Sequence, residues 1–486
     1  MANTSLEGMG QEIFESRYAY PGETKWADRA KVIAKTMASA ERDDDKEKVE
    51  KLFYESIGSG DLIPGGRIIF GAGRNRGHHN LLNCYVIIPE DDVDSIGQTV
   101  QDMYRISCAG GGVGFNVSKL RPKGDHIGSV KNSAPGSVSV LKMINEVGEH
   151  VRAGKNRRTA LMGILNITHP DLLEFLSVKL DQGELNNFNI SVAITNRFLE
   201  AVELGEDWYF TFNNKEYHSY DIARMNPEED RNEIISVIGM DEEDALSRAE
   251  NFQKVSWTDS FEMIGQRDIK ARELWDMIWK NSVESGDPGI YNIDLANSYT
   301  NVSYFESLDS TNPCGEISLP SYGNCCLGNI NLNNMVLDDG SDLDWKRLAK
   351  TVRTGIRFLD NVLTVNTFPT EECKKVGERS RRIGLGVTGL HYMLIKLGLS
   401  YGSESCLEFL ERLFGTIRDE AYKMSIYLSR DKKPFPEFDY KKYLEEDFAK
   451  TLPARIRMLI KRYGIRNAVM LTIPPCGTIS MLHGVS

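Results

Sequence analysis

The stretch Thr311-Asn312-Pro313-Cys314-Gly315-Glu316-Ile317 places one cysteine between a proline and a glycine. If the chain is locally extended here, the side chains of Asn312, Cys314 and Glu316 project the same way, so an amide, a thiol and a carboxylate meet in one small volume. The proline restricts the backbone, and the glycine allows conformations that other residues resist. The pattern indicates a rigid loop tip with a thiol beside a proton acceptor. A buried cysteine in an ordinary turn fits this heptapeptide equally well.

The composition is that of an ordinary globular protein. The chain has 486 residues, of which 41% are hydrophobic and 26% charged, and its net charge is -12. The negative charge gives no general basic surface for nucleic acid, although loops and helix N-termini can still bind phosphates locally. No run of 18 apolar residues and no signal-peptide pattern occurs, so we expect neither a membrane span nor a leader. Eight cysteines are too few for a disulfide scaffold, which indicates a reducing, cytoplasmic location.

Alternating helical and strand patterns predict an α/β architecture. We expect a helical N-terminal region at 1–75 and an α/β domain at 76–486 with an acidic surface insertion near 213–262. The expected strands are 81–88, 161–167, 189–194 and 468–473, and the expected helices include 26–41, 46–57, 271–282, 347–365 and 406–428. Asp94-Ser95 and His169-Pro170-Asp171 are each expected to cap a further helix.

Three loops have the composition of anion-binding segments. Residues 110–114 contain four glycines in five positions, which lets a backbone approach a ligand, but a tight turn between packed elements explains them equally well. Residues 474–480 offer two hydroxyls and backbone N–H groups for a phosphate if a helix follows. The basic segment 152–158 is most simply a solvated surface.

Cys84, Cys314 and Cys325 are the cysteines with a chemical interpretation. The C-x₂₋₄-C spacing of a zinc site is absent and the histidines form no paired pattern, so we expect no metal. A cysteine hydrolase needs a partner histidine that the sequence does not identify. Thiol redox chemistry fits better, with two cysteines that cycle between dithiol and disulfide beside a third with another role.

Several blocks together resemble the catalytic chain of ribonucleotide reductases. The signature is Asn312–Glu316 followed by 322–332 (YGNCCLGNINL), and further similar blocks in the same order are 110–122, 187–192, 286–291, 382–390 and 475–480. Each block is weak evidence by itself, but together they cover nearly the whole chain. The resemblance implies a ten-stranded α/β barrel with the Cys314 loop threaded through its centre, which would shield a radical from water.

The resemblance also implies a role for each residue of the signature. Cys314 corresponds to the cysteine that becomes a thiyl radical and takes the 3′ hydrogen of the ribose. Glu316 corresponds to the general base on the 3′ hydroxyl, and Asn312 to an amide that hydrogen-bonds the substrate. Cys84 and Cys325 correspond to the pair that supplies two electrons as the 2′ hydroxyl leaves as water.

Two binding sites follow from the same resemblance. The residues implied in binding the substrate, chiefly its phosphates, are Gly111, Gly112, Pro475, Gly477, Thr478 and Ser480. The residues implied in binding a deoxynucleotide effector and relaying its identity are Asp94, Ser95, Ile96, Arg157 and Arg158.

The sequences of these blocks are most similar to those of the adenosylcobalamin-dependent class, so we expect adenosylcobalamin as the radical source. The alternative is the oxygen-dependent class, whose radical comes from a separate metal-bearing subunit. The expected partners are a ribonucleoside di- or triphosphate, a thioredoxin- or glutaredoxin-type reductant and a second copy of the chain in a homodimer. A membrane and a nucleic acid are not expected.

The sequence also departs from the family pattern. Cys326 stands where the family usually has Asn, and Cys476 stands where Thr is usual. The family sequence continues beyond the equivalent of Ser486, so we expect a second polypeptide to supply the remaining barrel strands. A non-catalytic nucleotide-binding remnant is a further hypothesis. A thiol–disulfide oxidoreductase of proteins is disfavoured because the chain has no CxxC.

Overall fold

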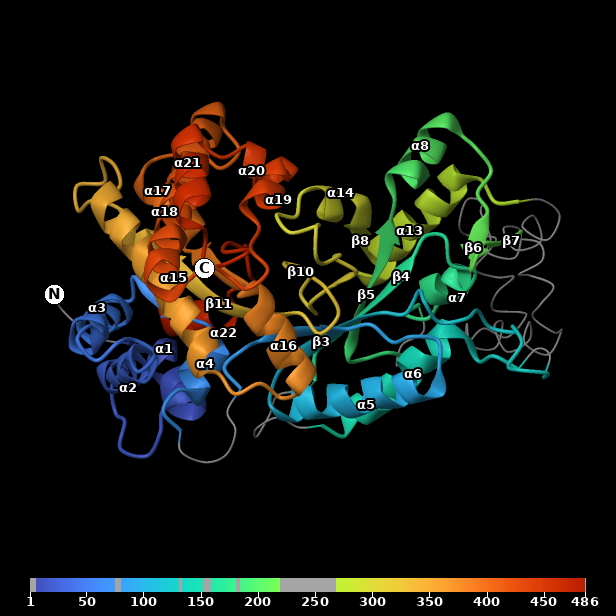
Figure 1. The fold of residues 1–486 in the computed structure, drawn as a ribbon, viewed down its shortest axis with the longest axis horizontal. Coiled ribbons are helices and arrows are strands. Elements are labelled where there is room, and N and C mark those ends of the chain that lie inside the picture. Colours follow the sequence, from blue (N-terminus) through green and yellow to red (C-terminus); the bar gives the residue numbers. More distant parts are fainter. Residues whose placement is uncertain are drawn as a thin grey trace. The chain divides into compact units, whose positions relative to one another are not determined.

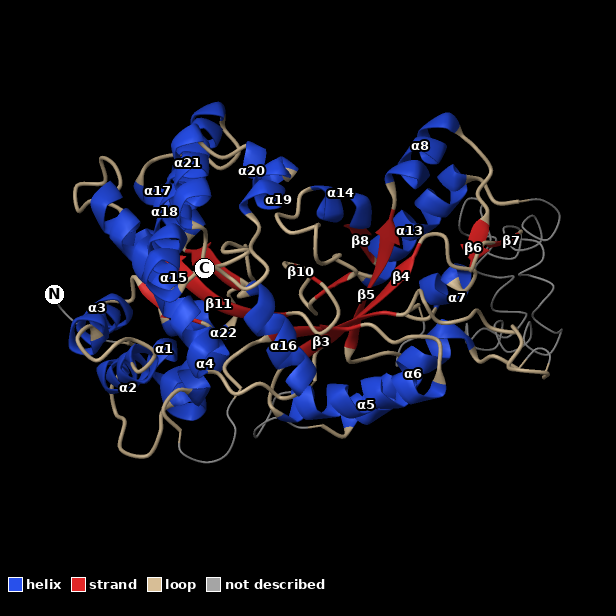
Figure 2. Cartoon of the chain, in the orientation of Figure 1, coloured by secondary structure: helices blue, strands red, loops and turns tan. Residues whose placement is uncertain are grey.

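The computed structural model describes residues 6–74, 80–130, 133–151, 159–180, 184–218 and 268–485. The described chain forms two compact units (Figure 1). Unit 1 comprises residues 1–86, 108–112 and 298–486, and unit 2 comprises residues 87–107 and 113–297. Both units combine helices with strands (Figure 2), as the α/β prediction requires.

Unit 1 begins with helices and adds most of its strands later in the chain. Its early elements are α1 (Met9–Ile13), the π-helix η1 (Phe14–Tyr18), α2 (Trp26–Ala38), α3 (Lys46–Gly58), β1 (Leu62–Pro64), α4 (Gly66–Gly71) and most of β2 (Cys84–Ile87). Its later elements are β9 (Ser310–Thr311), β10 (Ser318–Leu319), β11 (Asn324–Asn331), the 3₁₀ helix η2 (Leu332–Met335), α15 (Trp345–Val365), α16 (Glu371–Ser380), β12 (Ile383–Thr388), α17 (Leu390–Lys396), α18 (Glu404–Lys432), α19 (Tyr440–Glu445), α20 (Asp447–Lys450), α21 (Ala454–Tyr463) and α22 (Thr478–Leu482).

Strand β11 is the centre of unit 1, and every one of its residues is buried. It pairs in antiparallel fashion with β1 and with the first two residues of β2, and in parallel with β12. Helix α15 packs on β11 and β12. The approach is close at Gly355, where a Cβ would lie 2.8 Å from Leu385 Cδ1. Because β11 is buried on both faces, its sequence shows little of the alternation between polar and apolar residues that marks a strand with one solvent-facing side.

Unit 2 is built on parallel strands with helical connections. Its elements are α5 (Val93–Cys108), β3 (Gly112–Asn116), α6 (Gly136–Glu149), β4 (Leu161–Asn166), α7 (Leu172–Ser177), β5 (Phe188–Ile194), α8 (Asn196–Leu204), β6 (Phe210–Phe212), β7 (Lys215–Tyr217), α13 (Ala271–Ser285), β8 (Gly289–Asn292) and α14 (Ile293–Ser298). Strands β3, β4, β5 and β8 pair in that order, each in parallel with the next. Parallel neighbours need crossover connections, which α6 supplies between β3 and β4.

The expected helices at 26–41, 46–57, 271–282, 347–365 and 406–428 all form, with ends shifted by a few residues. The expected strand at 81–88 is shorter and spans Cys84–Ile87. The expected strand at 468–473 is wrong. That segment follows β12 through a few backbone hydrogen bonds and one isolated bridge, between Leu385 and Leu471. Because prolines follow at 474 and 475 and cannot donate a hydrogen bond, the ladder does not continue.

Both predicted helix caps are wrong in detail. Helix α5 already begins at Val93, and its first-turn contact is the N–H of Ser95 donated to Asp92 Oδ1 at 2.8 Å. The carboxylate of Asp171 makes no capping bond to α7. It accepts instead from the backbone N–H of Lys123 at 2.9 Å and of Ser137 at 2.8 Å, because it is buried and must satisfy these donors.

The glycine-rich segment at 110–114 is partly strand rather than wholly loop. Gly110 has φ +81°, and a Cβ there would lie 2.2 Å from Arg67 Nη1. Strand β3 then begins at Gly112, whose N–H donates to the carbonyl of Asn83 at 2.9 Å. The turn and the close approach therefore require glycine at position 110.

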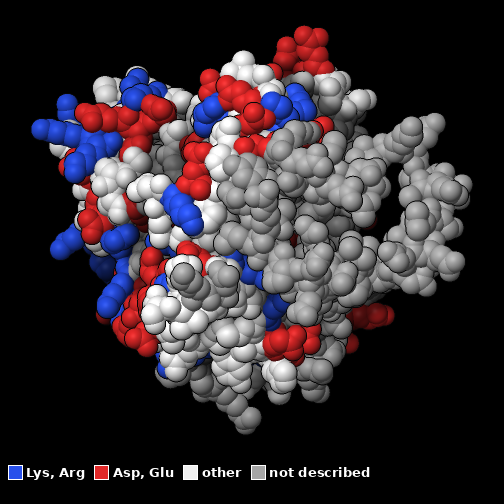
Figure 3. Space-filling model, turned by 90° about the vertical axis from the view of Figure 1, so that its right-hand side faces the viewer, with Lys and Arg blue, Asp and Glu red and all other residues white. Residues whose placement is uncertain are grey.

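Three expectations concern surface and exposure. Only residues 213–218 of the expected acidic insertion are described, as part of the β6–β7 hairpin, and 219–262 lies outside the described residues, as does the basic segment 152–158. On the face in Figure 3, the described Lys and Arg side chains are interspersed with Asp and Glu. Among the described residues, no helix is long and apolar enough to cross a bilayer.

A buried ionic contact joins the N-terminal helices of unit 1 to α15 and α18. Glu41, just after α2, accepts from Arg357 Nη2 at 2.7 Å, from Asn361 Nδ2 at 2.8 Å and from Lys432 Nζ at 3.0 Å. Burial alone would raise the pKa of Glu41. The hydrogen bonds from Arg357 and Asn361 and the charge of Lys432 outweigh burial and lower the pKa to about 2.

We expect Glu41→Gln to lower the free energy of unfolding by about 2 kcal/mol near pH 7, because it removes the carboxylate charge to which Arg357 and Lys432 donate. A carboxyl whose pKa is depressed in the folded state stabilises that state fully when the pH is above the ordinary pKa of the group. This stabilisation is lost as the pH falls towards 2. The difference between wild type and variant should therefore shrink on acidification. Urea unfolding at pH 7 and pH 3 measures it. Glu411→Gln, at an exposed position on α18, is the control and should be neutral at both pH values.

Candidate active site

Strand pairing in unit 1 brings together the two cysteines expected to form the redox pair. Cys84 opens β2 and Cys325 lies near the start of β11, and the antiparallel register places them directly opposite each other. Side chains so placed have Cβ atoms about 4.5–5.5 Å apart, close to disulfide distance. Cys84 is 6% exposed and Cys325 is fully buried, and the two thiols are not joined in a disulfide.

The hairpin of β9 and β10 carries the Asn312–Glu316 stretch. Below its tip, the N–H of Asn312 donates to the carbonyl of Ile317 at 3.2 Å, and the N–H of Gly315 donates to the carbonyl of Asn312 at 3.0 Å. Gly315 has φ +79°, a conformation that favours glycine. The sequence therefore folds here into the tight tip that the proline and glycine predict.

The side chain of Asn312 connects this tip to the cysteine pair. It is fully buried, and its Nδ2 donates to Cys84 Sγ at 3.2 Å and to Glu316 Oε2 at 2.6 Å. Its Oδ1 accepts from the N–H of Ile317 at 3.1 Å, which fixes the orientation of the amide. The Cys84 thiol also lies 4.0 Å from Glu316 Oε1. One amide thus holds a thiol and a carboxylate at hydrogen-bonding distance.

Burial sets the proton affinities of these groups. It raises the pKa of the Cys84 thiol, the charges of Glu316, Cys325 and Cys314 raise it further, and the hydrogen bond from Asn312 acts in the opposite direction. Burial also raises the pKa of the Glu316 carboxyl, which the hydrogen bond from Asn312 partly offsets. A carboxylate with a raised pKa is a better proton acceptor than one in water.

Cys314 differs from expectation because it is exposed rather than shielded. Gly315 beside it is exposed as well, and a Cβ at that glycine would meet nothing within 4 Å. The tip of the hairpin projects past its two short strands, so the thiol reaches solvent in the described chain. Cys314 nevertheless lies near enough to Cys84 for its charge to affect that thiol.

Two glycines of β12 make room for the site, and sequence reasoning noted their block without seeing this role. A Cβ at Gly384 would lie 3.0 Å from Cys325 Sγ and 2.7 Å from Thr472 Cγ2. A Cβ at Gly386 would lie 2.3 Å from Pro474 Cδ. Alternating glycines on one face of a buried strand were the available signal of close backbone approach.

The segment after 468 runs from the hairpin to the expected phosphate loop. Thr472 Oγ1 donates to the carbonyl of Glu316 at 2.9 Å, and Cys476 Sγ lies 3.8 Å from the carbonyl of Val387. Gly384 lies against Cys325, and Val387 lies three residues further along β12. Three residues correspond to about 10 Å along a strand. Strand β12 therefore fixes the spacing between the thiols and this loop.

Part of the expected phosphate loop lines a cavity of about 610 Å³, shared with residues near the N-terminus and with His483. Gly477 and Ser480 belong to the lining, whereas Pro475 and Thr478 do not. The hydroxyl of Ser480 donates to the carbonyl of Gly477 at 2.7 Å, and that of Thr478 accepts from Arg17 at 3.3 Å. The helix expected after the loop is α22, which has five residues.

The remaining predicted site residues do not join this cluster in the described contacts. Gly111 and Gly112 are buried, and the N–H of Gly112 is already used in pairing with Asn83. Asp94, Ser95 and Ile96 lie in the first turn of α5, in unit 2. Arg157 and Arg158 lie outside the described residues.

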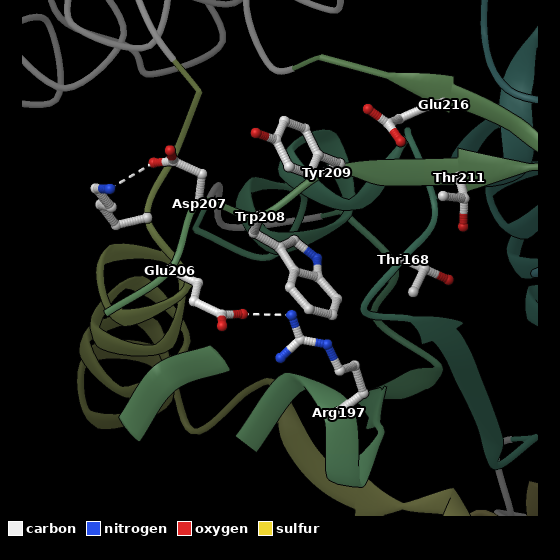
Figure 4. A pocket seen from close by; sticks show the side chains of 9 residues that line it. Thr168, Arg197, Glu206, Asp207, Trp208, Tyr209, Thr211 and Glu216 are labelled. Carbon is white, nitrogen blue, oxygen red and sulfur yellow. Dashed lines mark hydrogen bonds and ion pairs between the residues drawn. The ribbon is translucent and has the colours of Figure 1, made fainter. Parts of the chain in front are cut away.

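A separate hollow of about 590 Å³ lies in unit 2 (Figure 4) and contains none of the predicted site residues. It is lined by Trp208 and Tyr209 together with charged side chains. Arg197 pairs with Glu206, and Lys270 pairs with Asp207 at 2.6 Å, so the cations here already have counter-charges. No cluster of three or more potential metal ligands occurs among the described residues.

Comparisons with known proteins give a consistent result. The family model described as "Ribonucleotide reductase, barrel domain" matches residues 82–486, and "Ribonucleotide reductase, all-alpha domain" matches residues 4–77. The vitamin B12-dependent ribonucleoside-diphosphate reductase of Thermoplasma acidophilum is 35% identical over 435 residues, which is 89% of this chain and 48% of that protein. A Mycobacterium tuberculosis protein of the same name is 31% identical over 427 residues, covering 88% of this chain and 52% of that protein.

A ribonucleoside-diphosphate reductase subunit alpha of Chlamydia muridarum is 26% identical over 480 residues, covering 93% of this chain and 44% of that protein. The chain thus spans about half the length of the curated relatives it matches. The predicted fold, an α/β barrel of this type with a helical N-terminal region, is confirmed by these matches.

We expect Gly384→Ala to displace Cys325, because the added methyl group would overlap Thr472 and crowd the thiol. The variant should be less stable by about 1–3 kcal/mol and should form the Cys84–Cys325 disulfide more slowly under a mild oxidant. Mass spectrometry after alkylation follows disulfide formation, and urea unfolding gives the stability. Gly415→Ala on α18 is the matched control, since its Cβ would meet nothing within 4 Å. Equal rates in Gly384→Ala and wild type would contradict the packing argument.

Proposed function

The chain belongs to the ribonucleotide reductase family, and on this premise we propose that it reduces ribonucleotides to 2′-deoxyribonucleotides by thiyl-radical chemistry. The observation that carries the proposal is the meeting of Cys84, Cys325, Asn312 and Glu316 in one buried cluster of unit 1, with Cys314 on the adjoining tip. These are the residues to which the family resemblance assigns the chemistry.

In the proposed reaction, the Cys314 thiyl radical takes the 3′ hydrogen atom of the ribose, and Glu316 accepts the proton of the 3′ hydroxyl. The 2′ hydroxyl then leaves as water. Cys84 and Cys325 supply the two electrons and two protons, so their S–H bonds break and one S–S bond forms. At the end Cys314 returns the hydrogen atom to C3′, and Glu316 returns the proton to the 3′ oxygen. The raised pKa of Glu316 supports its role as base, and the raised pKa of Cys84 keeps that thiol protonated, as a group that supplies hydrogen must be.

Asn312 is proposed to orient the Glu316 carboxylate and the Cys84 thiol together before the substrate binds. Its bonds to Cys84 and Glu316 occupy both functional groups in the described structure. A substrate hydroxyl could replace one of these bonds without leaving a buried donor unpaired.

We propose that 474–480 binds the substrate phosphates together with Gly111 and Gly112. The cavity beside Gly477 and Ser480 supports this assignment, as does the distance that β12 fixes to the thiols. Asp94, Ser95 and Ile96 are proposed to contact a deoxynucleotide effector, and Arg157 and Arg158 to relay it. Asp94 is exposed and Ser95 and Ile96 are half-buried in the first turn of α5, which is compatible with that role.

For the radical source we propose adenosylcobalamin. The exposed tip at Cys314 and Gly315 fits a bulky group that approaches from outside, because no side chain of the glycine obstructs it. When bound, the cofactor would supply the acceptor for the hydrogen atom of the Cys314 thiol. The names of the Thermoplasma acidophilum and Mycobacterium tuberculosis relatives, at 35% and 31% identity, support this choice over a separate radical subunit.

We also propose the partners. A ribonucleoside di- or triphosphate is the substrate, a dithiol protein of the thioredoxin or glutaredoxin type restores the cysteine pair, and the chain acts as a homodimer in the cytoplasm. A second polypeptide is proposed to cover the Cys314 tip, because a thiyl radical exposed to water would be lost to side reactions.

Cys314→Ala should abolish deoxynucleotide formation while nucleotide binding is retained, because the substitution removes the radical site and leaves the buried cluster intact. Turnover with adenosylcobalamin and dithiothreitol is measured by chromatography, and binding by equilibrium dialysis. Cys406→Ala, at a buried cysteine of α18 remote from the hairpin in sequence, is the control and should retain turnover. Unchanged turnover in Cys314→Ala would refute the proposed mechanism, and binding without turnover in the wild type would favour the nucleotide-binding remnant.

The covering partner is tested with the part of the Thermoplasma acidophilum relative that this chain does not match. Adding that polypeptide should slow alkylation of Cys314 by iodoacetamide at least tenfold and raise turnover. Alkylation of Cys108, which is also exposed, serves as the internal reference. A rate at Cys314 that stays unchanged at saturating polypeptide would count against a covering partner.

A further inference from the structure

Three charged residues of unit 1 form a cluster that the proposed chemistry has not used. Glu306 and Arg382 are an ion pair with side chains 1% and 4% exposed. The other oxygen of Glu306 lies 3.8 Å from Arg379 Nη2 and makes no hydrogen bond among the described residues. Two guanidinium groups therefore share one carboxylate, which leaves the cluster with a formal charge of about +1. Arg379 is 37% exposed, whereas Arg382 and Glu306 are buried, so Arg382 is the cation that faces the interior.

The cluster lies on the side of β12 that faces Cys325. Gly384 is in contact range of Cys325, since its Cβ would lie 3.0 Å from Sγ. Arg382 precedes Gly384 by two residues, and residues two apart on an extended segment share a face. The parallel register, which pairs Ile383 with Cys326, also brings Arg382 level with Cys325. Arg381 directly precedes Arg382, so its side chain points to the opposite face, where it pairs with Asp360 at 2.8 Å.

The two thiols of the pair therefore have unequal surroundings. Burial raises the pKa of both. Around Cys84, the charges of Glu316, Cys325 and Cys314 raise the pKa further, and the group that acts against them is the neutral amide of Asn312 rather than a cation. Around Cys325, Cys326 and Glu316 act in the same direction, but Arg382 lowers the pKa. Cys84 is also the more exposed of the two residues, at 6% against 0%.

We propose that Arg382 is a positioning residue for the regeneration of the cysteine pair: this buried guanidinium, with Glu306 and the partly exposed Arg379, forms a positively charged cluster that stabilises the Cys325 thiolate when a reductant opens the Cys84–Cys325 disulfide. The inference rests on the proposed function only in assuming that these two cysteines form a disulfide. It assigns a direction to the exchange, with Cys84 attacked and Cys325 leaving.

The step balances as an ordinary thiol–disulfide exchange. A thiolate of an external dithiol attacks Cys84 Sγ, a mixed disulfide forms and the Cys84–Cys325 bond breaks. The electron pair of that bond leaves on Cys325 Sγ, beside Arg382, and a proton follows. The second thiol of the reductant then attacks the reductant's sulfur in the mixed disulfide and releases Cys84 as a thiolate. The reductant is thereby oxidised by two electrons and the cysteine pair is reduced by two.

The test uses the full-length chain oxidised to the Cys84–Cys325 disulfide, with dithiothreitol as reductant. Arg382→Gln should slow reduction about threefold to tenfold, because loss of the nearby cation raises the pKa of the leaving thiol. Arg382→Lys should restore most of the rate, since it keeps the charge. Glutathione with an alkylating quench should give mixed disulfide mainly on Cys84 in the wild type, and less selectively in Arg382→Gln.

Glu306→Gln separates charge from structure, because it breaks the same ion pair while raising the positive charge of the cluster. Reduction should be at least as fast as in wild type if charge matters, and slowed as in Arg382→Gln if the pair only supports the fold. Arg381→Gln is the matched control, since it breaks a buried ion pair on the opposite face. It should lower the thermal unfolding temperature without changing the reduction rate.

The inference is overturned if folded Arg382→Gln is reduced at the wild-type rate, if Glu306→Gln is slowed in parallel with it, or if glutathione adds mainly to Cys325 in the wild type. Failure of Cys84 and Cys325 to form any disulfide under oxidation would overturn the proposed redox pair and this inference together. Absence of ribonucleotide turnover with normal exchange kinetics would affect the proposed function alone, because the exchange assay requires no nucleotide.

Discussion

The antiparallel register between β2 and β11 is the constraint on which the site depends. It places Cys84 opposite Cys325. Because successive residues of a strand face opposite ways, a slip by one residue would turn Cys325 away and present Cys326 instead. Cys326 faces the side of Asp360, whose charge and the burial of the thiol both raise its pKa. Two adjacent cysteines therefore have different environments, and only one of them can pair with Cys84.

The register is held by close packing on both sides of β11. Leu359 of α15 packs against Gly328 of β11, where a Cβ would lie 3.4 Å from Leu359 Cδ2. A Cβ at Gly384 of β12 would lie 2.9 Å from Leu327 Cδ2 and 3.0 Å from Cys325 Sγ of β11, so there is no space there for a larger side chain. Buried ion pairs stabilise the surrounding helices, with Glu41 joined to Arg357 on one side and Asp360 joined to Arg381 on another. Thiol chemistry of the proposed kind needs atoms held to a fraction of an ångström, which packed strands supply better than loops.

The hairpin with Cys314 follows a different principle. Its base is fixed by backbone hydrogen bonds and by the buried amide of Asn312, while its tip is exposed. Rigid support below an accessible sulfur suits the proposed role of Cys314, which requires contact with both a radical source and a substrate. The cost is that the tip itself has little protection from solvent, which is why a covering partner enters the proposed function.

The sequence by itself determined the family and the helices with strong 3.6-residue periodicity, and it indicated the residues that are proposed to react, because motif blocks and apolar patterns are local properties of the chain. It did not determine the helix caps, the fate of 468–473 or the exposure of Cys314. Each of these depends on which distant donor or surface is nearby: Ser137 for Asp171, β12 for 468–473 and open solvent for the hairpin tip. The charged cluster beside Cys325 is the clearest case, since Glu306, Arg379 and Arg382 are separated by up to 76 residues and meet only in the folded chain. Electrostatic fields act through space, so only the tertiary structure decided which of the two thiols faces a positive charge.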